Sequence, residues 1–217
     1  MNIKAIIYDM DGLLIDSMLH WSEFWKVYWG QKGIEITREM GIHMTGRSGK
    51  ENAQWMKETY CPDLVEEEYM SVRNNWMPEM YREKTKLMPG AEKLVKYGKS
   101  KGLKQAIASG ASLDVIKIVV DRFIFSDHID EIVSADHVGH IGKPDPIIFL
   151  HTAEKLGIKP EHCVVFEDAE NGVTAAKRAG MKCVAVLDSR WSFGDFSQAD
   201  LVVDSLEDQA VYKFLDL

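Results

Sequence analysis

Six short apolar runs recur along the chain and predict the strands of one sheet. They span residues 3–9, 103–109, 130–134, 163–168, 183–188 and 200–204. Several of these runs are continuously apolar instead of alternating, which is typical of parallel strands covered on both faces. Helical patterns that stop at glycines such as Gly157 and Gly180 separate the later runs. This alternation predicts an α/β fold with a doubly wound, parallel, Rossmann-like sheet.

The alternation is interrupted after the first strand. Residues 16–87 show no convincing strand pattern, and helical segments are predicted there instead. These are a helix over 17–33 that stops at Gly30 or Gly33, one opening with the capping box Ser48–Glu51, and one opening with Asp63–Glu66 that Pro78 should kink or end. We therefore predict a helical cap, residues 16–87, inserted into a core of residues 1–15 and 88–217. Hinges are expected near residues 15–17 and 86–89.

Composition and charge narrow the possible functions. With 217 residues, 46% of them hydrophobic and 28% charged, the chain is typical of a soluble globular protein with a sizeable core. The net charge of −8, without a basic stripe, argues against a nucleic-acid partner. The chain shows no signal-peptide pattern and no apolar run long enough to span a membrane, so no membrane partner is expected.

The three cysteines predict neither a disulfide nor a zinc site. Cys163 and Cys183 lie within strand patterns, and Cys61 stands alone. We interpret all three as free thiols of a reduced protein, which implies a cytoplasmic location. Nothing in the sequence indicates an oligomer, and a monomer is expected.

Reactive side chains gather where the predicted strands end. In a parallel sheet, ligands bind beyond the carboxyl ends of the strands. The residues at these positions are Asp9, Asp11, Ser109, Gly110, Glu167 and Asp168, and Lys143 precedes a later helix. Each of them alone fits an ordinary turn, helix terminus or surface position. Their shared position in the predicted sheet is what points to one site.

Four carboxylates at one sheet edge repel one another unless their pKa values rise or a cation neutralises them. Such oxygen ligands suit Mg²⁺, which commonly shares its coordination with a substrate phosphate. We expect Ser109, Lys143 and the amide of Gly110 to hold phosphate oxygens. One aspartate is then free to attack phosphorus, and a neighbour to carry a proton. The residues thus predict phosphoryl transfer from a small phosphorylated metabolite, with Mg²⁺ as cofactor.

Four segments of the chain resemble the motifs of the haloacid dehalogenase superfamily of phosphotransferases. They are DMDGLLIDS, IASGAS, IGKPDP and VVFEDAENG, and the insert is similar to the small helical cap of the β-phosphoglucomutase-like subgroup. The resemblance covers nearly the whole chain. The dehalogenase branch is not expected, because it lacks the second aspartate, which is present here as Asp11.

The resemblance implies a role for each residue at the predicted site. Asp9 would be the nucleophile that becomes an aspartyl-phosphate, and Asp11 would be the general acid–base. Asp9, the backbone carbonyl of Asp11 and Asp168 would bind Mg²⁺, with Glu167 near the metal. Ser109 and Lys143 would hold the transferring phosphoryl group.

The cap is expected to select the substrate. It holds five of the six tryptophans and seven of the eleven methionines. We expect most of them to fill the core of a helical bundle, and one or two, such as Trp21, to face the cleft with Met18 or Met44. For Arg47 and Lys50 two interpretations stay open: contact with a second anionic group or hydroxyls of a substrate, or two solvated loop cations.

Three functions compete. The first is a Mg²⁺-dependent phosphatase acting on a small metabolite such as a sugar phosphate, and the second is a sugar-phosphate mutase of the β-phosphoglucomutase type. The third, more remote, is a phospho-accepting signalling receiver. The resembling mutase has a cap histidine where this chain places Trp21, with His20 one residue earlier. A tryptophan only donates a hydrogen bond and cannot accept a proton, so hydrolysis is favoured.

Overall fold

The computed structural model describes residues 2–123 and 125–216, which fold around a six-stranded parallel sheet. The strands are β1 (Ala5–Tyr8), β2 (Lys104–Ser109), β3 (Glu131–Ser134), β4 (Cys163–Glu167), β5 (Lys182–Val186) and β6 (Leu201–Val203). Their order in the sheet is β3-β2-β1-β4-β5-β6. Each predicted strand is present, with ends that differ by at most two residues. The predicted α/β, doubly wound architecture is confirmed.

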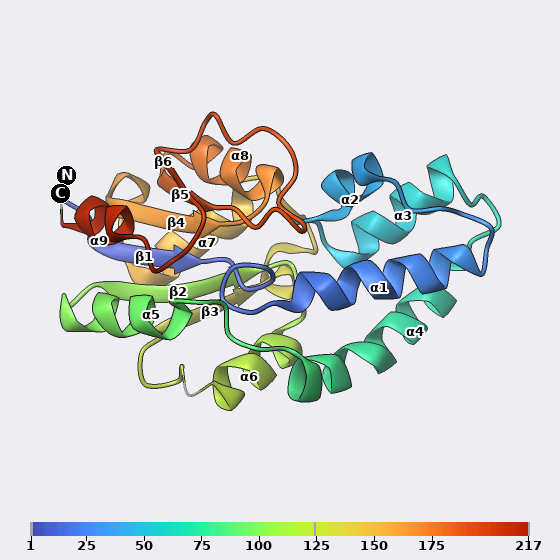
Figure 1. Ribbon diagram of the computed structural model, residues 1–217, viewed down its shortest axis with the longest axis horizontal. Coiled ribbons are helices and arrows are strands. Elements are labelled where there is room, and N and C mark those ends of the chain that lie inside the picture. Colours follow the sequence, from blue (N-terminus) through green and yellow to red (C-terminus); the bar gives the residue numbers. More distant parts are fainter. Residues whose placement is uncertain (1, 124, 217) are drawn as a thin grey trace.

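Helices cover both faces of the sheet (Figure 1). The core helices are α5 (Ala91–Ser100), α6 (Leu113–Arg122), α7 (Ile147–Leu156), α8 (Glu170–Arg178) and α9 (Gln209–Leu215), with the short 3₁₀ turns η2 (Ala135–Val138) and η3 (Pro160–His162). Buried side chains of α5, α6 and α9 share one cluster with Ile6 and Tyr8 of β1. Those of α7 and α8 share another with Ala5 and Ile7, which point to the opposite face. The apolar runs are therefore continuous because the sheet is buried on both sides.

Five helical segments lie together beyond one end of the sheet (Figure 1). They are α1 (Ser17–Gly30), α2 (Arg38–Met44), α3 (Gly49–Thr59), α4 (Glu66–Glu79) and the π-helix η1 (Met80–Lys84). Helix α2 was not predicted. It begins after Thr37, whose hydroxyl accepts a hydrogen bond from the Met40 amide at 3.2 Å.

Two N-terminal helix caps were predicted in this region, and the structure contains one of them. The capping box of α3 is confirmed: the Glu51 amide donates to Ser48 Oγ at 3.3 Å, and the Ser48 amide donates to the Glu51 carboxylate at 2.9 Å. The second predicted box is wrong, because α4 begins after Val65 without a side-chain cap. Asp63 instead lies in a turn closed by the Leu64 amide on the Cys61 carbonyl.

Pro78 acts as predicted. It lies inside α4, one residue before the α-helix ends, and the chain continues as the π-helix η1. Proline lacks the amide hydrogen that the α-helical ladder needs, and π-turns commonly appear where that ladder is disturbed.

The chain leaves and re-enters the core at adjoining points. The Asp16 amide donates to the Lys86 carbonyl at 3.0 Å, and the Lys86 amide donates back to Asp16 Oδ1 at 2.6 Å. Ile15 and Leu87 form an antiparallel bridge beside these bonds. The two crossings are therefore tied to each other as a short ribbon.

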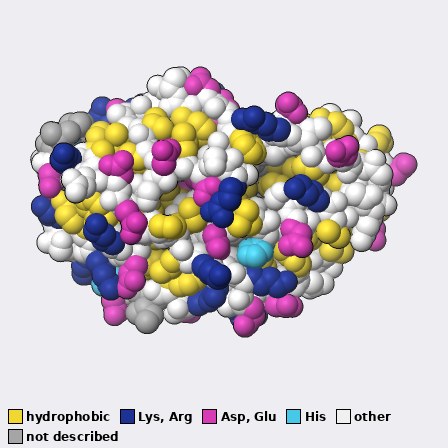
Figure 2. Space-filling model, in the orientation of Figure 1, with side chains coloured by type: hydrophobic (Ala, Val, Ile, Leu, Met, Phe, Trp, Pro, Cys, Tyr) yellow, Lys and Arg dark blue, Asp and Glu magenta, His cyan; other side chains and the backbone are white. Residues whose placement is uncertain are grey.

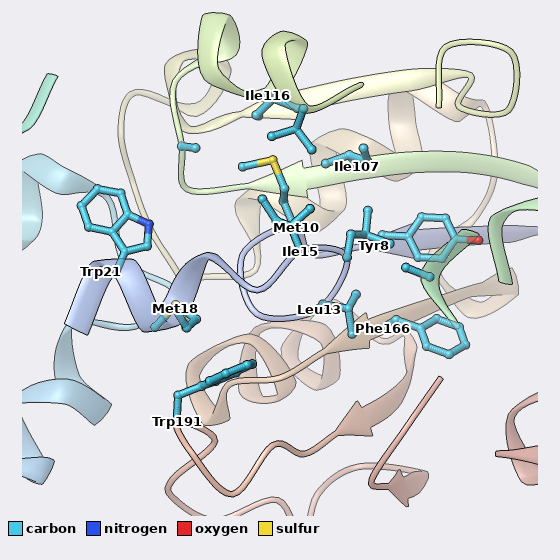
Figure 3. Close-up of a cluster of buried hydrophobic side chains, with 14 of the residues drawn as sticks. Tyr8, Met10, Leu13, Ile15, Met18, Trp21, Ile107, Ile116, Phe166 and Trp191 are labelled. Carbon is cyan, nitrogen blue, oxygen red and sulfur yellow. The ribbon is translucent and has the colours of Figure 1, made fainter. Parts of the chain in front are cut away.

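One hydrophobic cluster runs from the sheet into this helical region (Figure 3). Tyr8 lies at the end of β1, and Ile15 and Met18 continue the cluster into α1. The ring of Trp21 lies 5.1 Å from that of Trp76 on α4, so these tryptophans pack within the bundle as predicted. Cys163 and Cys183 are buried free thiols. In the part of the chain that the structure describes, no helix combines the length and hydrophobicity needed to cross a bilayer.

Candidate active site

A cavity with about 620 Å³ of empty space, part of it open to solvent, lies between the carboxyl ends of the central strands and the helices α1, α3 and α4. Its core-side lining comprises Asp9, Asp11, Ser109, Gly110, Ala111, Glu167, Asp168 and Ala169. Its cap-side lining comprises Met18, Trp21, Trp25, Met44, Thr45, Gly46, Arg47, Asn52, Tyr69, Arg73 and Tyr81. The structure thus brings most of the predicted site residues into one cavity.

Three carboxylates form the centre of the core wall. Asp9 follows β1, Glu167 is the last residue of β4, and Asp168 follows it. Because β1 and β4 are adjacent and parallel, the three residues lie at the same edge of the sheet. All three residues are buried, and one carboxylate oxygen of each lies within 4.8 Å of the others. Gly12 allows the Asp168 carboxylate to lie against the turn after β1: the φ of Gly12 is +86°, and a Cβ there would lie 2.0 Å from Asp168 Oδ2.

Lys143 reaches this cluster from the loop before α7. Its ammonium is fully buried, donates hydrogen bonds to Asp9 and Glu167, and lies 3.5 Å from the Ala108 carbonyl. Burial alone would lower the pKa of Lys143, but the two carboxylates outweigh it and raise the pKa. The lysine therefore stays charged and offsets part of the negative charge around Asp9.

The cluster still lacks positive charge. Burial, followed by the charges of Glu167 and Asp9, raises the pKa of Asp168 well above its usual range. Burial also raises the pKa of Glu167 to about 7, against the opposing effect of Lys143. Asp168 Oδ2 is buried without a hydrogen-bond partner among the described residues. These properties fit a divalent cation, since a bound cation would satisfy the free oxygen and reverse both shifts.

Glu167 has less freedom than the two aspartates. Its Oε2 accepts the backbone amides of Asp168 at 3.0 Å and Ala169 at 3.1 Å, and its Oε1 accepts Lys143. Asp9 and Asp168 are therefore the carboxylates best placed to hold a cation, with Glu167 supporting them.

Asp11 lies in the same cavity but outside this cluster. Its Oδ1 accepts hydrogen bonds from Ser17 Oγ at 2.6 Å and from the Tyr81 hydroxyl at 2.5 Å. Trp21 Nε1 donates to the same tyrosine hydroxyl at 3.1 Å. Burial, and next the charge of Asp9, raises the pKa of Asp11, although these hydrogen bonds lower it. These influences oppose one another with a net rise in pKa, and the Asp11 carboxylate lies outside the group formed by Asp9, Glu167 and Asp168.

Ser109 and Gly110 lie at the end of β2 on the wall of the cavity. Ser109 Oγ accepts the Ala111 amide at 3.1 Å and is 3.4 Å from Asp11 Oδ2. A Cβ at Gly110 would lie 3.2 Å from the Arg47 carbonyl, so the cap loop approaches closely there. Both residues are placed where the sequence predicted.

Of the cap residues predicted to face the cleft, most line the cavity and Lys50 does not. Trp21, Met18 and Met44 line the cavity, as does Arg47, whose Nε donates to the His43 carbonyl at 2.9 Å. Lys50 is exposed and lies outside the cavity, so its predicted substrate contact has no support. Sequence reasoning missed Ser17, Asn52, Arg73 and Tyr81. Of these, only Ser17 belongs to one of the matched motifs.

The core also holds the cap loop directly. Asn171 of α8 donates through Nδ2 to the Ile42 carbonyl at 3.1 Å and to the Thr45 carbonyl at 2.9 Å. The Lys143 amide donates to the Gly46 carbonyl at 3.2 Å. These bonds tie the end of α2 and the loop that follows it to the core. On the face of the molecule seen in Figure 2, acidic and basic side chains are interspersed and form no basic stripe.

Comparison with known proteins agrees with this geometry. A family model of haloacid dehalogenase-like hydrolases matches residues 3–180. A Drosophila melanogaster protein named "Probable pseudouridine-5'-phosphatase" is 34% identical over 211 residues, or 95% of this chain and 91% of the relative. The beta-phosphoglucomutase of Bacillus subtilis (strain 168) is 32% identical over 213 residues, with 95% and 91% covered. The crystal structure of beta-phosphoglucomutase from Clostridium difficile matches with a TM-score of 0.81 and 28% identity, covering 98% and 96% of the two chains.

The family match covers both the first motif and the acidic segment after β4, which the fold brings together in the cavity. The similarity to solved mutase structures extends over the cap as well as the core. The chain belongs to the haloacid dehalogenase-like hydrolase family, and its relatives indicate a phosphoric monoester hydrolase.

Proposed function

We propose that this protein is a Mg²⁺-dependent phosphatase that hydrolyses a small sugar phosphate through an aspartyl-phosphate on Asp9. One observation carries the proposal: the carboxylates of Asp9, Glu167 and Asp168 meet at one wall of the cavity, and the buried ammonium of Lys143 donates to Asp9 and Glu167. The named activity of the Drosophila relative, on a phosphorylated nucleoside, supports a substrate with a sugar phosphate.

Binding of the phosphoryl group falls to the core wall. Lys143, the Ser109 hydroxyl and the Gly110 amide hold its oxygens, and Lys143 also offsets the charge of Asp9. The carboxylates of Asp9 and Asp168 and the backbone carbonyl of Asp11 are the groups that would hold Mg²⁺. When bound, the metal supplies neutralisation of negative charge on the phosphoryl oxygens and the carboxylates.

The reaction proceeds in two displacements. Asp9 forms a bond to phosphorus while the bond to the leaving oxygen breaks, and Asp11 donates its proton to that oxygen. Asp11 then takes a proton from water, whose oxygen forms a bond to phosphorus while the bond from phosphorus to Asp9 breaks, so that inorganic phosphate leaves and the Asp9 carboxylate is restored. The raised pKa of Asp11 suits the first step, because it favours the protonated acid.

A mutase is the second candidate, because two of the matched proteins are beta-phosphoglucomutases. A mutase must protect the aspartyl-phosphate from water until a sugar hydroxyl arrives. Trp21, and not His20, lines the cavity, and its indole nitrogen donates to Tyr81. No proton-accepting group occupies this position on α1, which favours hydrolysis.

The cap, residues 16–87, closes over the site in this proposal, and it turns about the paired crossings near residues 15–17 and 86–89. Closure excludes bulk water and brings the cap wall to the substrate. Membership of the hydrolase family removes the signalling receiver from consideration. A monomeric state, a cytoplasmic location and the lack of nucleic-acid or membrane partners stay predictions.

The test is a screen of phosphorylated metabolites with and without Mg²⁺, with the Asp9→Asn variant as blank. Release of inorganic phosphate that needs both Mg²⁺ and Asp9 is the expected result. A parallel incubation with β-glucose 1-phosphate and a trace of the 1,6-bisphosphate separates the two candidates. Accumulation of glucose 6-phosphate with little free phosphate would replace the phosphatase by the mutase.

A further inference from the structure

Two residues that line the cavity each have a buried oxygen without a hydrogen-bond partner in the described chain. They are Asp168, through Oδ2, and Asn52, through Oδ1. Leaving a buried acceptor unpaired costs about 1–3 kcal/mol, so each such atom calls for an explanation. A cation explains the oxygen of Asp168. The oxygen of Asn52 lies in the cap and needs a different partner.

Asn52 lies on α3 and is only 6% exposed. Its Nδ2 donates to the Met44 carbonyl at 2.9 Å, which fixes the orientation of the amide. The remaining Oδ1 can only accept a hydrogen bond. The missing partner is therefore a donor, such as a hydroxyl group.

Arg73 of α4 adjoins the same face of α3. A Cβ at Gly49 would lie 2.8 Å from Arg73 Cζ, so glycine makes room for the guanidinium. Gly49 is three residues before Asn52, and residues at this spacing share one side of a helix. The guanidinium also lies over the ring of Trp21, 4.9 Å from its centroid, and lines the cavity.

The guanidinium is rich in unused donors. Its Nη1 donates to Asn74 Oδ1 at 3.2 Å. Within residues 2–123 and 125–216, the ion pairs do not include Arg73. The cavity wall thus includes an unpaired acceptor on Asn52 and donors on Arg73, which lies close to Gly49 of the same helix as Asn52.

We infer that Asn52 and Arg73 form a subsite for the hydroxyl groups of a neutral, polyhydroxylated substrate end. The inference rests on the proposed phosphatase function and specifies its substrate class. A hydroxyl donates to Asn52 Oδ1, and the same or a neighbouring hydroxyl oxygen accepts from Arg73. A second ionised phosphate or a carboxylate fits Arg73 but offers no proton to Asn52. The apolar wall of Met18, Trp25 and Met44 suits the carbon skeleton of the same molecule.

Calorimetry on the Asp9→Asn protein with Mg²⁺ tests this subsite without requiring turnover. The ligands are three pairs matched in chain length: glycerol 3-phosphate and n-propyl phosphate, ribitol 5-phosphate and n-pentyl phosphate, sorbitol 6-phosphate and n-hexyl phosphate. In at least one pair, the polyol phosphate should bind about tenfold more tightly than the alkyl phosphate. Adding Asn52→Ala should reduce that ratio to within about twofold.

Arg73→Met keeps an unbranched apolar side chain over Trp21 but removes the guanidinium, and it should also reduce the affinity ratio. If Asn52→Ala lowers the melting temperature, the Arg73→Met result decides the test. Gln54→Ala is the matched control, because this amide is on α3 but is exposed and outside the cavity. It should leave the ratio unchanged.

Three results would overturn the inference: equal binding within all three pairs, a ratio that survives both Asn52→Ala and Arg73→Met, or tighter binding of ribulose 1,5-bisphosphate than of ribitol 5-phosphate. Failure of the proposed function looks different. It would appear as no phosphate release by the wild-type protein, whatever the Asp9→Asn variant binds.

Discussion

The core wall and the cap wall of the cavity are built from different side chains held in different ways. On the core wall, Asp9, Glu167 and Asp168 lie at the carboxyl ends of β1 and β4. Each of these strands is hydrogen-bonded to a neighbouring strand on both sides. On the cap wall, aromatic and methionine side chains surround a few polar groups that helices and one loop present. In the proposed function, the groups that would attack phosphorus and transfer protons thus lie on the wall built from the sheet. The groups that we expect to contact the rest of the substrate lie on the helices that are joined to the sheet through two adjoining crossings.

The largest effect is expected on the core wall at Asp9. Asp9→Asn removes the attacking charge with little change in shape, so turnover should fall by about 10⁴–10⁶-fold. Phosphate release is the measurement, and circular dichroism should show an unchanged fold. Asp114→Asn is the matched control, because Asp114 is exposed on α6 and should keep full activity. Substantial activity in the purified Asp9→Asn variant would show that Asp9 is not the nucleophile.

Removal of metal tests the charge balance of the same wall. EDTA should abolish phosphate release and Mg²⁺ should restore it, whereas Ca²⁺ should substitute poorly because its coordination is larger and looser. Mg²⁺ should also raise the midpoint of thermal unfolding, since it binds the folded protein and relieves repulsion among buried carboxylates. Asp168→Asn should weaken that shift. Full activity in EDTA would contradict the metal requirement.

Asp11 lies where the two walls meet. Asp11→Asn removes proton transfer, which is worth about 10²–10⁴-fold in rate. The loss should be much smaller for p-nitrophenyl phosphate than for an alkyl phosphate, because a good leaving group needs no proton. An equal loss for both substrates would show that Asp11 does not act as the general acid.

Tyr81 is a positioning residue that links the cap to Asp11. Tyr81→Phe removes the hydrogen bond to Asp11 Oδ1 and also the acceptor of Trp21 Nε1. We expect a loss of kcat of about tenfold for alkyl phosphates and a smaller loss for p-nitrophenyl phosphate. A loss that is the same for both would mean that Tyr81 only supports packing.

The smallest effect is expected at the contact that holds the two walls together. Asn171→Ala removes hydrogen bonds to the carbonyls of Ile42 and Thr45. KM should rise about threefold to tenfold while kcat changes little, because closure becomes less favourable. Hydrogen exchange in α2 should become faster. Unchanged exchange there would show that Asn171 does not stabilise the closed arrangement.

The core wall could be predicted because its residues follow local rules. Continuous apolar runs mark the buried strands, and parallel strands bring Asp9 and Asp168 to the same edge wherever they occur in the chain. The cap wall follows no such rule. Tyr81 meets Asp11 across 70 residues, and the proximity of Arg73 to Gly49 depends on how α3 and α4 pack.

The helix ends show the same limit on a smaller scale. Helix α2 escaped prediction because it has only seven residues, includes Gly41 and carries Met40 where a capping box usually has Glu or Gln. The predicted cap at Asp63 failed because Pro62 and Asp63 form the centre of a turn between Cys61 and Leu64. A turn that competes for the same residue cannot be excluded by a spacing rule alone.

The ribbon formed by the two crossings has a consequence for protein engineering. Because Ile15 and Leu87 are already bonded partners, a few linking residues are enough to join them directly. The helices from Ser17 to Lys84 therefore leave and rejoin the sheet at one place, so we expect their replacement by a short linker to leave the order of the strands unchanged. A chimaera that carries the helices of a relative at this one junction should keep the carboxylates of the sheet edge in place.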